Sequence, residues 1–118
     1  MDPPGRIHYL EIVTPDVDEV CAAYAAATGL VFGETDAGLG NARTAPLDGG
    51  GMVGIRGPLR PTEEPIVRPY WLVEDIETAV AALTDAGATI AHPPLEIPGH
   101  GTFAITIQAG IEHGLWQL

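Results

Sequence analysis

The sequence contains two similar halves, and this duplication constrains the fold more than any other feature. The segment that starts at Ile7 can be laid on the segment that starts at Ile66, and Asp16 then falls opposite Asp75. Each aspartate follows an apolar, β-branched stretch and precedes apolar residues at helical spacing. A chain with such an internal repeat is expected to fold into two modules with the same order of elements.

The first half predicts one helix and four strands. A strand is expected over Ile7–Val13, and a helix is expected to begin at Asp16, where Glu19 completes a capping-box pattern. Gly29 is the expected end of this helix. Three short strands are expected after it, between glycine-rich turns, near Val31–Glu34, Asn41–Ala45 and Met52–Arg56.

The second half repeats this order. A strand is expected over Val67–Val73, followed by a helix that Asp75 caps and that ends near Gly87. Three further strands are expected near Thr89–Ala91, Thr102–Ile107 and His113–Gln117. The sequence therefore predicts a single domain over residues 1–118, with modules at 6–57 and 66–118 and a proline-rich connector at 58–65.

The expected fold class is α+β, with two βαβββ modules that form a shared curved sheet around a cleft. Each module has only about 50 residues and would bury a core poorly alone, so we expect the two modules to share one core. A cleft between modules is a common place for a small-molecule site.

Charge and composition exclude several function classes. The 118 residues include 16 acidic and 5 basic ones, a net charge of −11, which argues against nucleic acid or an anionic membrane as partner. The chain has no Lys and no Ser, which excludes P-loop NTPases, pyridoxal enzymes and serine hydrolases. Its lone cysteine, Cys21, and a start without a signal-peptide pattern lead us to expect a cytoplasmic protein.

Four stretches carry a resemblance to a known superfamily. They are Glu11–Asp16 with Tyr24 and Gly29 after it, Tyr70–Glu77, Pro94–Ala104, and Gly114–Gln117. With the doubled βαβββ order, they resemble the vicinal oxygen chelate superfamily of glyoxalase I, bleomycin resistance proteins and extradiol dioxygenases. The pattern is most similar to the glyoxalase-like subgroup. The resemblance implies the fold described above and a homodimer.

The resemblance also implies where a divalent metal would be held. Metal-using members place His, Gln or Glu ligands on the first and last strands of each module. The corresponding positions here are Tyr9, Arg68, Val53 or Gly54, and Gly114. None of these is a good metal ligand, because Arg stays protonated and Gly has no side chain. We therefore expect no cofactor and no metal at the family positions. The alternative is a different metal site, made of His92, His100 and a carboxylate such as Glu96.

Strand alternation places a set of polar and aromatic side chains on the inward face, namely Tyr9, Glu11, Arg68, Tyr70 and Trp116. One interpretation is a structural ion pair between Glu11 and Arg68. The other is a ligand site in which Arg68 holds an anionic or carbonyl group and the aromatic rings stack on an apolar ligand. In that case Glu11 and His100 are the candidate acid–base residues.

Three functions remain open at this stage. The first is a glyoxalase-like protein that binds a small organic ligand in the inter-module cleft without the divalent metal of the family. The second is a metal-dependent or metal-free lyase, isomerase or dioxygenase of the same superfamily. The third is a non-catalytic regulatory or interaction domain.

Overall fold

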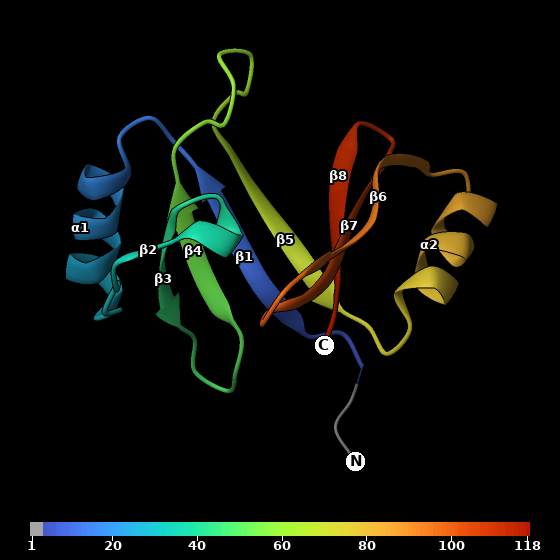
Figure 1. Ribbon diagram of the computed structural model, residues 1–118, viewed down its shortest axis with the longest axis horizontal. Coiled ribbons are helices and arrows are strands. Elements are labelled where there is room, and N and C mark those ends of the chain that lie inside the picture. Colours follow the sequence, from blue (N-terminus) through green and yellow to red (C-terminus); the bar gives the residue numbers. More distant parts are fainter. Residues whose placement is uncertain (1–3) are drawn as a thin grey trace. The chain divides into compact units, whose positions relative to one another are not determined.

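The computed structural model describes residues 4–118, and the chain forms two compact units. The first unit is Tyr9–Val67, and the second is Arg68–Leu118 together with the described residues before Tyr9. Each unit has one α-helix and its own set of strands (Figure 1). The predicted connector, residues 58–65, belongs to the first unit.

The strands of the first unit have the order β2-β3-β4-β1, in which β1 runs parallel to β4 and the other neighbours are antiparallel. Its elements are β1 (Ile7–Val13), α1 (Val17–Thr28), β2 (Thr35–Asp36), the short 3₁₀ helix η1 (Ala37–Leu39), β3 (Ala42–Pro46) and β4 (Met52–Arg56). The prediction of a strand at 31–34 is wrong, because that segment is irregular and only the next two residues pair with β3.

The helix α1 covers an apolar face of these strands. The buried cluster there consists of Ile12, Cys21, Ala45, Val53 and Ile55. Because side chains alternate along a strand, Glu11 of β1 and Gly54 and Arg56 of β4 belong to the opposite face. The sequence thus places Glu11 and Arg56 on the face of the strands opposite the apolar cluster.

Of the two caps predicted for α1, only the one at its C-terminus is confirmed. Gly29 ends the helix with a left-handed φ of 79°, and its N–H donates to the Ala25 carbonyl, as predicted. The predicted capping box is wrong: within residues 4–118 the Asp16 side chain makes no cap hydrogen bond. Instead, the Thr14 hydroxyl accepts from the Asp16 N–H at 3.1 Å.

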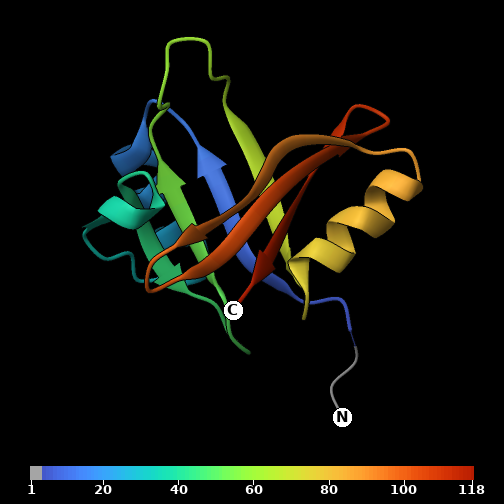
Figure 2. The same ribbon diagram turned by 45° about the vertical axis from the view of Figure 1, so that its right-hand side comes forward.

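The strands of the second unit have the order β5-β8-β7-β6, in which β5 runs parallel to β8. Its elements are β5 (Ile66–Leu72), α2 (Ile76–Asp85), β6 (Thr89–Ile97), β7 (Gly101–Gln108) and β8 (Ile111–Gln117). The helix α2 lies against one face of β6, β7 and β8 (Figure 2). As predicted, Asp75 caps it: its carboxylate accepts from the Thr78 N–H at 3.0 Å.

The second unit includes residues that precede Tyr9 in the chain. These residues belong to it because the Leu72 N–H donates to the Arg6 carbonyl at 2.7 Å and the His8 ring lies 5.6 Å from that of Trp116.

The strand β6 is longer than the predicted 89–91 and contains His92, which the sequence placed in a loop. Its other side has no strand neighbour in the described chain, so Pro93 and Pro94 are tolerated there.

Neither helix within residues 4–118 is long and apolar enough to span a membrane.

Candidate functional site

A buried ion network lies on the face of the first unit opposite α1. Arg56, the last residue of β4, donates from Nε to Glu11 Oε2 at 2.9 Å. Its Nη1 and Nη2 donate to the two carboxylate oxygens of Glu63 at 2.9 and 2.8 Å, and Nη1 also donates to the Gly57 carbonyl at 3.1 Å. The side chains of Arg56, Glu11 and Glu63 are 7%, 9% and 13% exposed. A bidentate pair of this kind fixes geometry as well as charge.

The neighbouring carboxylates keep the buried Arg56 guanidinium charged. Burial works to lower the pKa of Arg56, but the hydrogen bonds and charges of Glu63 and Glu11 outweigh burial and raise that pKa. Glu63 also accepts a hydrogen bond from the Leu59 N–H at 2.7 Å. The Glu63 carboxylate therefore makes one contact within the connector and another with Arg56 of β4. The sequence predicted a proline-rich connector over residues 58–65 but not these contacts.

Tyr9 occupies the space in front of Gly54. A Cβ added to Gly54 would lie 2.6 Å from Tyr9 Cζ, and Gly54 is paired with Glu11 in the parallel β1–β4 ladder. The Tyr9 side chain is buried, and this burial, followed by the negative charge of Glu11, raises the pKa of Tyr9 well above its ordinary value. The hydroxyl therefore keeps its proton at neutral pH and is a hydrogen-bond donor there.

The second unit contains a similar tyrosine–glycine contact, from a different register position, between Tyr70 and Gly114. The two residues are paired in the parallel β5–β8 ladder, and a Cβ on Gly114 would lie 2.6 Å from Tyr70 Cγ and 2.7 Å from the Pro69 carbonyl oxygen. In both units, therefore, a tyrosine ring fills the place that a side chain on the last strand would need.

Aromatic rings gather on the face of the second unit opposite α2. Tyr70 meets Trp116 edge-on, with ring centroids 5.7 Å apart, and Phe103 lies 6.2 Å from Tyr70 and 6.4 Å from Trp116. His92 stacks on Phe103 at 4.8 Å with an angle of 32° between the planes. Tyr70 and Trp116 are buried, whereas Phe103 and His92 are partly exposed. We call these four residues the ring surface.

His100 and Arg68 take part in the same unit in different ways. The His100 carbonyl accepts from the Trp116 indole N–H at 3.0 Å and so fixes that ring. Arg68 donates from Nη2 to Glu112 Oε1 at 3.1 Å, and the Arg68 side chain is 9% exposed. An ion pair between Glu11 and Arg68 would join the two units and stays a prediction. The catalytic roles of Glu11 and His100 stay predictions as well.

Of the predicted ligand-binding residues, the structure brings Tyr9 and Glu11 together in one unit, and Tyr70 and Trp116 together in the other. Sequence reasoning missed Arg56, Glu63, Glu112, Phe103 and, as a ring-surface residue, His92. Strand alternation could have found Arg56, since it lies two residues beyond the inward-facing Gly54.

Within the described residues 4–118, no group of three or more His, Cys, Asp or Glu side chains is placed to hold a metal ion. This finding covers the conceivable set of His92, His100 and Glu96.

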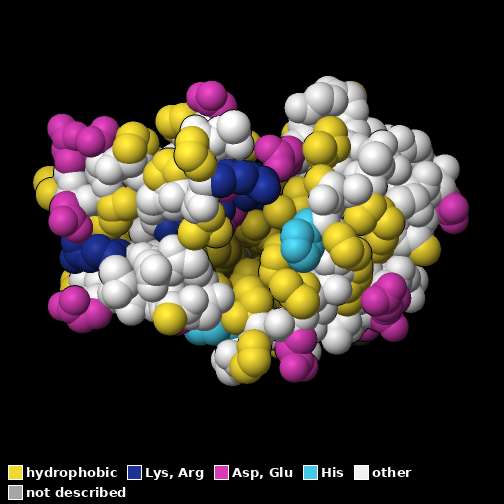
Figure 3. All heavy atoms as spheres, turned by 45° about the horizontal axis from the view of Figure 1, so that its top comes forward, with side chains coloured by type: hydrophobic (Ala, Val, Ile, Leu, Met, Phe, Trp, Pro, Cys, Tyr) yellow, Lys and Arg dark blue, Asp and Glu magenta, His cyan; other side chains and the backbone are white. Residues whose placement is uncertain are grey.

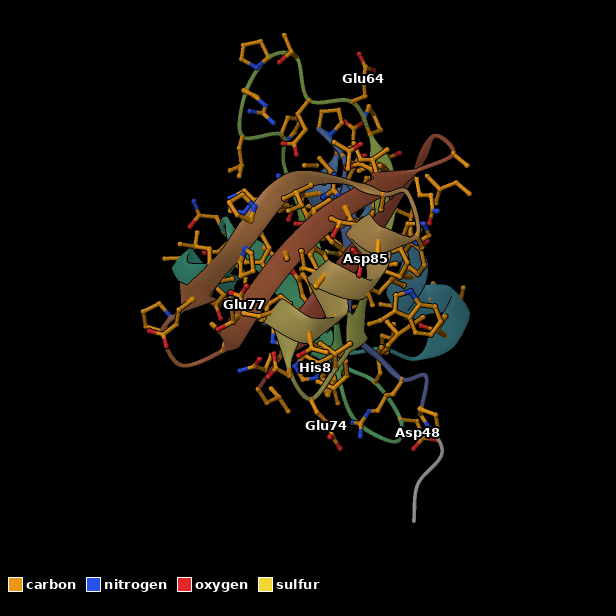
Figure 4. The ribbon with its side chains drawn as sticks, turned by 90° about the vertical axis from the view of Figure 1, so that its right-hand side faces the viewer. His8, Asp48, Glu64, Glu74, Glu77 and Asp85 are labelled. Carbon is orange, nitrogen blue, oxygen red and sulfur yellow. The ribbon has the colours of Figure 1, made fainter. Side chains whose placement is uncertain are left out.

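Apart from the buried Glu11 and the largely buried Glu63, most acidic side chains of the described chain are distributed over its surface. On the face shown in Figure 3 they form several separate groups, with hydrophobic side chains between them. Glu74, Glu77 and Asp85 lie along α2 and the turn before it (Figure 4), and all three are exposed. This pattern is that of a solvated helix face rather than of a binding patch.

Comparison with known proteins places this geometry in a known fold. No protein-family model matches the sequence, and no curated protein matches it. Among solved structures, the chain is similar to a hypothetical protein of Bacillus halodurans, with a TM-score of 0.74 and 14% identity over 97% of this chain and 94% of that one. The methylmalonyl-CoA epimerase of Mycobacterium tuberculosis gives a TM-score of 0.72 at 12% identity, over 94% and 86%.

The methylmalonyl-CoA epimerase of Streptomyces coelicolor, in complex with 2-nitronate-propionyl-CoA, gives a TM-score of 0.69 at 17% identity, over 98% of this chain and 95% of that one. The fold is that of the glyoxalase-like proteins. The predicted α+β fold class with two βαβββ modules is confirmed. The cleft between the modules stays a prediction.

Proposed function

We propose that this chain is a glyoxalase-like protein that binds a small organic ligand without the divalent metal of the superfamily. The observation that carries the proposal is the ring surface, in which buried rings support the partly exposed Phe103 and His92. Aromatic side chains with an apolar body favour flat organic ligands over ions. The Streptomyces coelicolor epimerase, which shares the fold, is known in complex with a CoA derivative.

The absence of a metal is proposed from the two tyrosine–glycine pairs. The resemblance places the last-strand ligands at Val53 or Gly54, and at Gly114, and the rings of Tyr9 and Tyr70 occupy the space in front of the two glycines. The residues present therefore do not fit a divalent ion of the superfamily type. Metal analysis of the untagged protein, with nickel, zinc, iron and manganese offered in turn, tests this part. One ion retained per chain would overturn it.

Ligand binding itself is tested by screening planar aromatic compounds for a rise in melting temperature and then titrating the hits. Phe103→Ala removes the most accessible large ring of the ring surface, and we expect it to weaken binding of these compounds by about 5- to 30-fold, the effect of losing one stacked ring. Ile111→Ala is the matched control, because Ile111 is also an apolar residue and is 59% exposed at the start of β8.

The outcomes separate clearly. Hits that lose affinity in Phe103→Ala and keep it in Ile111→Ala support the proposal. The absence of any compound that stabilises the wild-type protein, or equal affinities in all three proteins, would refute it. A lyase, isomerase or dioxygenase activity remains the alternative function, and the turnover of a hit compound would favour it.

We also propose that the protein is cytoplasmic, which its lone cysteine favours, and that it forms a homodimer, as the resemblance implies. Light scattering after size-exclusion chromatography tests the second statement. A mass of 12.3 kDa, that of the single chain, across the micromolar range would refute it.

A further inference from the structure

The side chain of His92 is turned onto the ring surface by an irregularity in its strand. Along β6 and β7, Ile90 pairs with Thr106, so an unbroken antiparallel register would pair residue 92 with Ala104. Ala104 is fully buried in the cluster under α2. The register shifts after Ile90, and His92 pairs with Ile105 instead.

A shift of one residue moves a side chain to the other face of a sheet. His92 therefore lies on the face of Phe103 rather than beneath α2, and its ring reaches 4.8 Å from that of Phe103. A second shift follows before Leu95, which pairs with Phe103. Two irregularities thus enclose His92, and such bulges commonly re-aim a side chain at a functional site.

The same segment fixes the tautomer of the His92 ring. Its Nδ1 lies 2.7 Å from the carbonyl oxygen of Pro93. A carbonyl oxygen can only accept, so Nδ1 carries the hydrogen and donates it. In the neutral ring the lone pair then belongs to Nε2, which is the hydrogen-bond acceptor. An imidazole whose other nitrogen is tied to a backbone carbonyl in this way has a defined orientation and a defined acceptor.

We propose that His92 is a ligand-binding residue that accepts, through Nε2, a hydrogen bond from an N–H or O–H group on an aromatic ligand lying on the ring surface. The ligand class is a planar ring with a donor at its edge, such as an indole or a phenol. This inference rests on the proposed function, because it states which polar group the same ligand carries. The aromatic rings of the ring surface stack on the ligand, and the hydrogen bond to His92 Nε2 fixes the orientation of the ligand.

The test compares indole with 1-methylindole, two rings of nearly equal shape of which only the first has an N–H donor. Isothermal titration of the wild-type protein is expected to show tighter binding of indole by about 3- to 10-fold, the effect of one hydrogen bond. His92→Phe keeps a ring against Phe103 and removes the acceptor, so the preference should vanish while the affinity for 1-methylindole stays. In His92→Gln the amide oxygen can reach the place of Nε2, so this variant should retain part of the preference for indole over 1-methylindole.

His113→Phe is the matched control, since His113 pairs with Thr106 on the α2 side of the sheet. It should keep the wild-type preference. Long-range ¹H–¹⁵N spectra of the wild-type imidazoles provide a measurement independent of any ligand, and they should show the His92 proton on Nδ1. A proton on Nε2 in the neutral ring would overturn the inference.

The titrations distinguish this inference from the proposed function. Equal binding of indole and 1-methylindole by the wild-type protein, or a preference that survives in His92→Phe, refutes the role of His92 and leaves an aromatic-binding surface. Failure of both probes to bind at millimolar concentration refutes the ring surface as a site for aromatic ligands, and the role of His92 with it.

Discussion

Replacing Arg56 by methionine should cost more stability than any surface substitution in this chain. Arg56 is 7% exposed and makes four hydrogen bonds, of which three go to the carboxylates of Glu11 and Glu63. Methionine fills much of the same volume but leaves two carboxylates, 9% and 13% exposed, without this partner. Removing one partner of a buried ion pair costs about 3–5 kcal/mol.

Urea unfolding at pH 7 measures this loss. With an m-value of about 2 kcal/mol per molar, the midpoint of Arg56→Met should fall by about 1.5–2.5 M relative to the wild-type protein. The matched control is Asp18→Asn. Asp18 also pairs with an arginine, Arg43, at 3.0 Å, but its side chain is 91% exposed. That change should move the free energy of unfolding by no more than about 1 kcal/mol.

The loss should also depend on pH in a defined direction. Without Arg56, the folded variant buries two carboxylate charges without the cation that offsets them, and a proton on either carboxyl group removes that cost. The stability deficit of the variant relative to the wild-type protein should therefore shrink as the pH falls from 7 toward 4.5. The reasoning would be refuted by a loss below about 1 kcal/mol at pH 7, or by a deficit that does not shrink at pH 4.5.

Two further predictions concern the fold. Gly114→Ala should destabilise the protein by about 1–3 kcal/mol, because the new methyl group meets the Tyr70 ring, whereas Gly33→Ala meets only one atom at 3.9 Å and should stay within about 1 kcal/mol. Equal melting temperatures would contradict this. Asp75→Ala should cost about 1 kcal/mol through the lost cap of α2, and Asp16→Ala much less, because its carboxylate caps nothing in the described chain. Chemical denaturation of both variants measures the two free energies of unfolding, and a larger loss of stability in Asp16→Ala than in Asp75→Ala would contradict this prediction.

Much of the fold could be predicted because its signals are local and occur twice. The strand at Ile7–Val13 is confirmed, and both helices follow the aspartates that the duplication aligned. The error at 31–34 has a physical reason. Phe32 packs against the first core from irregular backbone while Val31 is 78% exposed, and apolar, β-branched composition alone does not make a strand.

The error at His92 has a different origin. Two consecutive prolines, Pro93 and Pro94, ordinarily indicate a loop, since proline cannot donate to a ladder. Here they occupy a strand that has a neighbour on one side only among the described strands, where that loss is tolerated. Which residue of an interrupted strand faces the rings depends on register shifts, and those leave no mark in a single sequence.

Alternation placed Tyr9, Glu11, Tyr70 and Trp116 on the inward faces of their strands, and the structure confirms their burial. Their role in a site stays a prediction. The partners of the charged residues were not predictable in the same way, because Glu63 lies in the connector, which has no periodicity. An irregular segment can return a carboxylate to a buried arginine only through its three-dimensional path.

The tyrosine–glycine pairs make positions 9 and 54 interdependent, and likewise positions 70 and 114. A histidine introduced at Gly54 would collide with Tyr9, and removing the Tyr9 ring alone would leave an unfilled volume beside the glycine. Each single change is therefore harmful, and only the double change could create room for a new coordinating side chain. An evolutionary or engineered route to a coordinating side chain at these glycines must therefore cross an epistatic barrier in each half.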